Sequence, residues 1–310
     1  CTKMAGAGFN TEAECPTWLT FLERIFNSNA ELIDYLQQAA GYTLTGRISE
    51  ECLFFCYGTG RNGKSKFLET LLHLLGDYAQ SADFSTFLHR DGYRVPNDIA
   101  AMKGARLVTA REANEGQRLN EALVKDLTGG DTISARFLHA ELFDYRPQFK
   151  IWLAANTRPP IRGVDTGIWR RIKMIPFRVT IPEEEQDRAL LDKLLAEKDG
   201  ILSWCVQGCL KWQEEKQGLQ EPADVRMATA DYRITMDTLG AFISDECQEG
   251  EGYQVSVASL FDAYRVWCEG TGEHALTKKA FGMRLEDRGF IPLRTNIARY
   301  WLGLRLKTNG

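Results

Sequence analysis

The segment "YGTGRNGKSKF", residues 57–67, decides how the rest of the chain is interpreted. Gly58, Gly63, Lys64 and Ser65 fit the phosphate-loop pattern G-x-x-x-x-G-K-[ST]. In such a loop the backbone N–H groups surround phosphate oxygens, the lysine reaches the β- and γ-phosphates, and the serine hydroxyl holds Mg²⁺. The segment therefore predicts a site for a nucleoside triphosphate and Mg²⁺.

The sequence on both sides of the loop favours this interpretation. Residues 52–57, "CLFFCY", are a short apolar run typical of a buried strand, and helical apolar spacing follows from Lys64 to about Leu75. A phosphate loop requires this context, because the helix N-terminus adds its positive end to the site. Gly60 and Asn62 are expected to serve the conformation of the loop. The predicted nucleotide-binding residues here are Gly58, Thr59, Gly60, Arg61, Asn62, Gly63, Lys64, Ser65 and Lys66.

Further apolar runs predict an α/β fold with a mainly parallel sheet covered on both faces. The expected strands are 105–110, 150–155 and 171–177, with helices between them. We expect a helical lead-in over 1–46, an ATPase core over 47–215, a linker with some helix over 216–236 and a second domain over 237–310. In that last part the pattern predicts helices near 237–247, 256–269 and 277–288, then two strands.

Three polar positions follow the predicted strands of the core. Glu112, in "RLVTAREANE", can help Ser65 hold Mg²⁺ and aim water, although Arg111 stands where many such motifs carry a first acid. Asn156 ends the strand in "KIWLAANTRPP" and can bind the γ-phosphate or the attacking water. Arg170 and Arg171 can stabilise charge on a transferring phosphoryl group, often from a neighbouring subunit. Each position also has a simpler interpretation that stays open. Glu112 could be a surface carboxylate, Asn156 a turn residue, and the arginine a member of a surface ion pair.

Composition narrows the class of protein. The net charge of −4 is unremarkable, but residues 277–310 carry eight Lys and Arg against two Asp and Glu, a net of +6, whereas residues 240–276 carry one against seven, a net of −6. The eight cysteines are scattered and lack zinc-site spacing, which predicts reduced thiols, as in cytosolic proteins. No long apolar run predicts a membrane span, so together with the reduced thiols we expect a cytoplasmic protein.

The compact spacing of these motifs resembles the superfamily 3 helicases of the AAA+ class. It is most similar to the helicase part of the primase–helicases of poxviruses, phages and plasmids. The residues that carry the resemblance are "GYTLTG" (41–46), "LVKDLTGGDTISARFL" (123–138), "FKIWLAANTRPPI" (149–161) and "WRRIKMIPF" (169–177). A primase domain would precede this chain in such a protein.

The resemblance implies a role for each matching residue. The phosphate loop would bind ATP and Mg²⁺, Glu112 would be the Walker B carboxylate and Asn156 the first sensor. Arg171 would be the arginine finger, with Arg170 as the reserve candidate. Lys125 would lie near the nucleotide at a subunit junction of a ring, which is expected to be a hexamer.

The resemblance also implies two DNA-binding regions. A β-hairpin between Asp131 and Tyr145 would point into a central channel and contact single-stranded DNA through His139 at its tip and Arg136 nearby. The C-terminal part resembles a winged-helix module that could contact duplex DNA. Its candidate residues are Lys278, Lys279, Arg284 and Arg288 on the third helix, and Arg294, Arg299 and Arg305 on the wing. An ordinary turn at His139 and a solvated or protein-docking face in the tail are the simpler interpretations.

Three functions are compatible with these residues. An ATP-driven helicase accounts for the motifs, the hairpin and the basic tail. A DNA-binding initiator or regulatory AAA+ ATPase that assembles without translocating needs the same loop and the same tail. A small-molecule phosphate-loop enzyme, such as a nucleotide kinase, leaves the tail unexplained.

Overall fold

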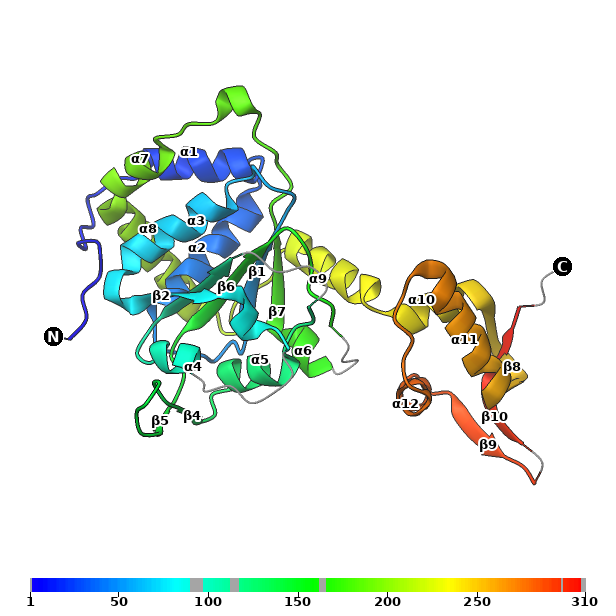
Figure 1. Ribbon diagram of the computed structural model, residues 1–310. Helices are drawn as coiled ribbons and strands as arrows, with labels where there is room; N and C mark the ends of the chain where they lie inside the picture. Colours follow the sequence, from blue (N-terminus) through cyan, green and yellow to red (C-terminus); the bar gives the residue numbers. More distant parts are fainter. Residues whose placement is uncertain (1, 90–96, 112–116, 162–165, 297, 308–310) are drawn as a thin grey trace. The chain divides into compact units, whose positions relative to one another are not determined.

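The computed structural model describes residues 2–89, 97–111, 117–161, 166–296 and 298–307. The chain forms two compact units, Cys1–Tyr232 and Arg233–Gly310, which are described separately below. The first unit contains helices on both sides of a central sheet (Figure 1). Its α-helices are α1 (Pro16–Ile25), α2 (Ala30–Leu44), α3 (Lys64–Leu75), α4 (Asn97–Ala101), α5 (Glu121–Thr128), α6 (Thr166–Arg171), α7 (Leu190–Ala196), α8 (Lys198–Glu214) and α9 (Ala223–Thr235).

The central sheet has five strands in the order β2-β3-β6-β1-β7, and every neighbouring pair is parallel. The strands are β1 (Leu53–Tyr57), β2 (Ala79–Asp83), β3 (Leu107–Arg111), β6 (Lys150–Ala155) and β7 (Ile172–Pro176). Four of them match the strands predicted from apolar runs. The fifth, β2, has the polar sequence AQSAD, which an edge strand tolerates because only one of its sides pairs with a neighbour.

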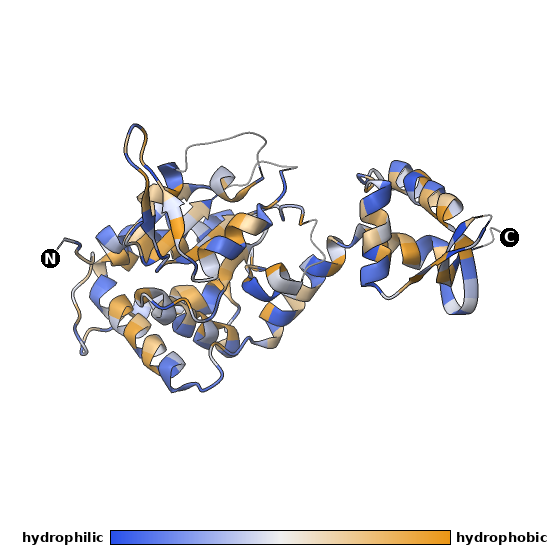
Figure 2. Cartoon of the chain, turned by 90° about the horizontal axis from the view of Figure 1, so that it is seen from below, coloured by the Kyte–Doolittle hydropathy of each residue, from blue (hydrophilic) through white to orange (hydrophobic). Residues whose placement is uncertain are grey.

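The alternation of side chains along the strands supplies a core on each face of the sheet. In Figure 1, α1, α2, α3, α7 and α8 lie on one side and α4, α5 and α6 on the other. On the first side, Phe54 and Trp152 of neighbouring strands pack with ring centroids 4.3 Å apart. On the opposite side, Phe55 contacts Phe84 and Tyr232. The inner strands are correspondingly apolar along their length (Figure 2).

Helices α2 and α8 approach closely because each has a glycine at the contact. A Cβ atom on Gly208 would lie 1.9 Å from the carbonyl oxygen of Gln37, and one on Gly41 would lie 2.1 Å from the backbone nitrogen of Cys209. Any larger residue would therefore force the two helices apart. This pair of helices forms much of the layer behind the phosphate loop.

The segment expected to be a linker is packed against the first unit. Glu50 accepts a hydrogen bond from the backbone N–H of Leu219 at 3.1 Å, and Lys173 pairs with Glu221 at 2.5 Å. In helix α9, Tyr232 is buried and donates to the carbonyl of Pro159. Residues 219–232 thus belong to the core structure, where composition alone indicated a loose connection.

The second unit has its own hydrophobic core and contains three helices and a three-stranded antiparallel sheet. Its elements are α10 (Thr238–Glu246), β8 (Cys247–Ser256), α11 (Val257–Thr271), α12 (Lys278–Asp287), β9 (Ile291–Arg294) and β10 (Arg299–Leu306). The three helices agree with those predicted from the sequence. Strand β8 was not predicted, because its glycines and acids lack apolar alternation.

Candidate functional site

The phosphate loop connects the carboxyl end of β1 to the N-terminus of α3, as its motif requires. Gly60 and Gly63 have backbone φ angles of +106° and +85°, which residues other than glycine rarely adopt. A Cβ on Gly58 would lie 2.2 Å from the carbonyl oxygen of Phe177, and one on Gly63 would lie 2.6 Å from Ile25. Close packing therefore requires glycine at positions 58 and 63, and the backbone conformation of the turn also requires it at 63.

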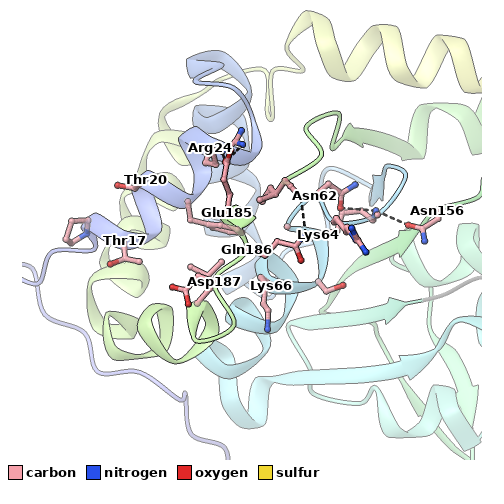
Figure 3. A pocket seen from close by; sticks show the side chains of 18 residues that line it. Thr17, Thr20, Arg24, Asn62, Lys64, Lys66, Asn156, Glu185, Gln186 and Asp187 are labelled. Atoms are coloured by element: carbon pink, nitrogen blue, oxygen red, sulfur yellow. Dashed lines mark hydrogen bonds and ion pairs between the residues drawn. The ribbon is translucent and has the colours of Figure 1, made fainter. Parts of the chain in front are cut away.

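Lys64 is held at the centre of the loop by three hydrogen bonds. Its Nζ donates to the carbonyl oxygen of Gly58 at 2.6 Å, to Asn62 Oδ1 at 3.1 Å and to Asn156 Oδ1 at 3.0 Å (Figure 3). Asn62 in turn donates to the carbonyl of Phe177 at 3.2 Å, which agrees with the conformational role expected for it. Burial lowers the pKa of Lys64 below its ordinary value. The structure thus brings the loop lysine and Asn156, 92 residues apart, into contact.

A cavity of about 700 Å³ opens beside the loop and is lined by Gly60–Lys66 together with Asn156. Its other walls come from parts of the chain to which the sequence assigned no role. Helix α1 contributes Thr17, Thr20 and Arg24, and the segment before α7 contributes residues such as Gln186. Figure 3 shows these side chains on the side of the cavity away from Lys64 and Asn156.

A hydrogen bond attaches this second wall to the phosphate loop, and an ion pair joins its two parts. The backbone N–H of Ile181 donates to the carbonyl of Arg61 at 2.7 Å. Within the wall itself, Arg24 of α1 forms an ion pair with Glu185 of the segment before α7 at 2.5 Å. These residues are far apart in the sequence and meet only in the folded chain. The sequence of α1 is that of an ordinary amphipathic helix, so it did not indicate a place at the cavity.

The acidic side of the predicted Mg²⁺ site is incompletely described. Ser65 lines the cavity, but Glu112 and Glu115 lie outside the described residues. Arg111, at the end of β3, pairs with Glu69 of α3 at 2.6 Å. In the described part of the chain, no three His, Cys, Asp or Glu side chains cluster in a way that could hold a metal ion.

Arg170 and Arg171 lie at the edge of the sheet opposite to Lys64. They end α6 and directly precede β7; Arg171, expected to begin the strand over 171–177, is the last residue of the helix instead. Because Leu53 pairs with Ile172 in a parallel register, both arginines are at the amino edge, whereas the phosphate loop follows Tyr57 at the carboxyl edge. A strand of five residues separates these edges by roughly 16 Å.

The two arginines differ in their surroundings. Arg171 donates from Nε to Thr128 at 3.1 Å, from Nη1 to the carbonyl of Gly167 at 2.9 Å and from Nη2 to Glu51 at 3.1 Å. Its side chain is 10% exposed, whereas that of Arg170 is 65% exposed. Lys125 lies on α5, one turn before Thr128, and is therefore near the arginines and outside the cavity wall.

The predicted β-hairpin is present as β4 (Ile133–Ala135) and β5 (Phe143–Tyr145). His139 lies in the connecting turn with a φ angle of +60°, and Arg136 begins that turn. The turn also exposes apolar side chains, with Leu138 62% and Leu142 63% exposed.

Arg288 and Arg305, two of the basic candidates in the second unit, contact polar side chains of the same unit. Arg288 donates from Nη2 to both carboxylate oxygens of Asp237, the residue that caps α10, so it connects the end of α12 to the start of α10. Arg305 donates to Gln248 at 2.8 Å and lies 4.1 Å from the ring centroid of Tyr253. The other candidates are Lys278, Lys279 and Arg284 on α12, Arg294 on β9 and Arg299 on β10.

None of the helices in the described ranges has both the length and the apolar character needed to cross a membrane.

Two family comparisons match separate parts of the chain. Residues 56–171 match a family of unknown function (DUF5906), and residues 234–296 match the "Poxvirus D5 protein-like" family. The first range runs from the end of β1 to Arg171, and the second covers most of the second unit.

Similar proteins come from large DNA viruses. The chain is 30% identical over 268 residues to "Putative helicase L207/L206" of Acanthamoeba polyphaga mimivirus, which covers 80% of this chain and 28% of that protein. It is 24% identical over 285 residues to "Putative helicase 022R" of Frog virus 3, covering 85% of this chain and 29% of that protein. The chain thus spans less than a third of the length of these relatives.

The chain also resembles a solved structure in its fold. The C-terminal region of NrS-1 superimposes with a TM-score of 0.59 at 10% identity, covering 96% of this chain and 77% of that one. Together with the phosphate loop and its contact to Asn156, these similarities support the assignment of the chain to the superfamily 3 helicases, as the C-terminal part of such a protein.

Proposed function

We propose that the chain is the ATP-dependent motor of a replicative DNA helicase, of the AAA+ kind found in viruses and other mobile elements. The observation that carries the proposal is the contact of Lys64 with Asn156 at the head of a nucleotide-sized cavity. A cation and an amide at the end of neighbouring parallel strands suit a γ-phosphate and the water that attacks it. The strand order β3-β6-β1 supports this, because Arg111, the residue before Glu112, ends the strand beside the one that leads to Asn156.

The residues of the loop fit a bound MgATP. Lys64 donates to a backbone carbonyl and two amide oxygens, and these are weaker acceptors than a phosphate dianion. We therefore expect Lys64 to turn from the Gly58 carbonyl to the phosphates on binding. Mg²⁺ would be held by Ser65 and Glu112 and would neutralise charge on the phosphates. The wall formed by Thr17, Thr20 and Gln186 is left for the ribose and base.

Oligomer formation follows from the position of the arginines. Neither arginine can reach the nucleotide of its own subunit from the amino edge of the sheet, so an arginine that acts on ATP has to act on a neighbouring copy. A closed ring, expected to be a hexamer, supplies such a neighbour at every site. The hairpin tip with Arg136 and His139 would then contact single-stranded DNA in the channel.

The second unit is proposed to be a winged-helix domain that binds duplex DNA. The order of its elements, with a helix, a strand, two helices and two further strands, supports this proposal. Lys278, Lys279 and Arg299 are exposed on the third helix and the ribbon. Arg288 is better explained as a structural partner of Asp237. A primase domain would belong to the rest of a longer protein.

The test is strand displacement from forked DNA by the wild-type protein and by Lys64→Ala. The wild type should hydrolyse ATP and separate the strands, whereas Lys64→Ala should lose at least about 99% of both activities because the γ-phosphate loses its cation. Lys211→Ala, which removes an exposed lysine paired with Asp34, is the matched control and should retain both.

The two leading functions give different results in this experiment. ATP hydrolysis and duplex binding without strand displacement would favour the initiator or regulatory ATPase. An unchanged hydrolysis rate in Lys64→Ala would contradict the assignment of the phosphate loop itself.

A further inference from the structure

Glu51 joins both arginines through a single carboxylate oxygen. Its Oε2 accepts from Arg170 Nη2 at 2.6 Å and from Arg171 Nη2 at 3.1 Å. The residue ends a tight turn, since its N–H donates to the carbonyl of Ile48 at 3.0 Å, and it directly precedes the segment that leads into β1. No motif in the sequence drew attention to it.

The backbone of Glu51 is strained. Its φ angle of +45° lies in the left-handed region, which is unfavourable for a residue other than glycine. Such a conformation persists only where surrounding contacts demand it. Here it directs the carboxylate to the end of α6, so the strain accompanies a specific placement of a negative charge.

The two contacts of Glu51 serve different ends. Arg171 is held by three different partners and is 10% exposed, so it cannot extend away from its own subunit without breaking a buried network. Arg170 is 65% exposed, and the contact described for it uses Nη2 alone. Arg171 thus fixes Glu51 from the buried side, and Glu51 fixes Arg170 on the exposed side.

We propose that Glu51 is the positioning residue for Arg170, and that Arg170 is the arginine which reaches the ATP of a neighbouring copy. This inference rests on the proposed function. An unrestrained arginine samples many rotamers, and ordering it costs conformational entropy. A carboxylate that already holds one nitrogen of the guanidinium leaves the others directed outward for phosphate oxygens. Arg171, which the sequence favoured for this role, becomes the buried support.

The first test is a double-mutant cycle on ATP hydrolysis by the assembled protein. Glu51→Gln should lower kcat about tenfold. The KM and the Kd for ATP should not change, because ATP is bound at the carboxyl edge of the sheet of the neighbouring subunit, whereas Glu51 lies at the amino edge. Arg170→Ala should lower kcat at least about a hundredfold, and the double variant should match Arg170→Ala. Asp34→Asn, which also removes a carboxylate from an exposed ion pair, is the control and should behave as wild type.

The second test asks on which subunit Glu51 acts. Glu51→Gln protein has an intact phosphate loop, and Lys64→Ala protein has an intact Glu51–Arg170 pair. Mixed rings should therefore hydrolyse ATP faster than the two separate proteins together, a gain that a merely structural role would not give. If Glu51→Gln proves unstable, Glu51→Asp takes its place in both tests.

Three results would overturn the proposal: effects of Glu51→Gln and Arg170→Ala that multiply, a raised KM in Glu51→Gln, or mixed rings with no gain. Failure of the underlying function looks different, because the wild type itself would then not hydrolyse ATP, or Lys64→Ala would not change the rate.

Discussion

At the scale of single residues, Lys150 shows how a buried cation supports the site from a distance. It begins β6, is 1% exposed, and donates to the carbonyls of Thr45 at 2.6 Å and Arg47 at 2.9 Å. Its Nζ also lies 4.4 Å from the ring centroid of Tyr42. Burial, with a smaller contribution from the charge of Arg106, lowers the pKa of Lys150 from 10.5 to about 7. The lysine thus ties the start of β6, the strand that ends in Asn156, to the segment before β1.

The lowered pKa of Lys150 predicts a pH dependence of stability. Between pH 7 and 10.5 the unfolded chain binds more protons at this residue than the folded chain does. The free energy of unfolding should therefore rise with pH over this window, by at most about 1.4 kcal/mol per pH unit. Lys150→Met should lack that contribution. Urea unfolding of both proteins at about pH 7.5 and pH 9 measures it, and parallel pH profiles would contradict the prediction.

The residues of the candidate site differ in whether a short stretch of sequence is enough to predict them. Gly58, Gly63, Lys64 and Ser65 were predictable because the phosphate chemistry fixes residue types over eight consecutive positions. Asn156 needed the further assumption that neighbouring parallel strands end together, and the bond to Lys64 confirms their proximity. The wall with Thr20 and Gln186 could not be predicted, since it depends on how α1 and the segment before α7 pack on the loop. The choice between Arg170 and Arg171 likewise depends on burial, which adjacent arginines in a sequence do not reveal.

At the scale of elements, the β4–β5 hairpin combines basic and apolar groups at an exposed turn. Arg136 and His139 can contact phosphates, while Leu138 and Leu142 present apolar surface beside them. We expect Arg136→Ala with His139→Ala to lower unwinding at least about tenfold while ATP hydrolysis changes less than about threefold, because the hairpin is separate from the residues that line the nucleotide cavity. Strand displacement and phosphate release, measured on one preparation, check this.

The control for the hairpin is a substitution elsewhere on the same small sheet. Ser134→Ala removes a hydroxyl that donates to Asp144 at 2.5 Å but leaves the turn intact, so it should unwind DNA normally. Equal losses of unwinding and hydrolysis in the Arg136/His139 variant would mean that the hairpin serves assembly or folding instead.

Elements with strong apolar patterns were predictable, and those without were not. Strands β1, β3, β6 and β7 are buried runs, so their positions followed from the sequence alone. Strand β2 is polar because it forms the edge of the sheet, and β8 contains the sequence CQEGEGYQVS, which alternates too poorly to be recognised. Helix α6 was not predicted as an element of its own, because its six residues are too few to show helical spacing.

At the scale of the whole molecule, the chain divides into two units whose cores share no residue. The described residues that line the cavity proposed to bind the nucleotide are all in the first unit, while the net charge of +6 in residues 277–310 lies in the second. This separation predicts that ATP hydrolysis and duplex binding can be removed independently of each other.

A protein truncated after residue 236 tests this separation. It should keep ATP hydrolysis within about threefold of the full chain, because every described residue that lines the cavity remains. Its affinity for duplex DNA should fall, and the slope of log K against log salt should become shallower by about 0.9 for each DNA phosphate that the protein no longer neutralises.

Point variants refine the measurement in the full chain: Lys279→Ala and Arg299→Ala should each reduce the slope by about 1. Arg288→Ala is the matched basic substitution, and it should lower the stability of the second unit without changing the slope, since its guanidinium is engaged by Asp237. An unchanged salt slope after truncation would instead identify the basic end of the chain as a protein-docking surface.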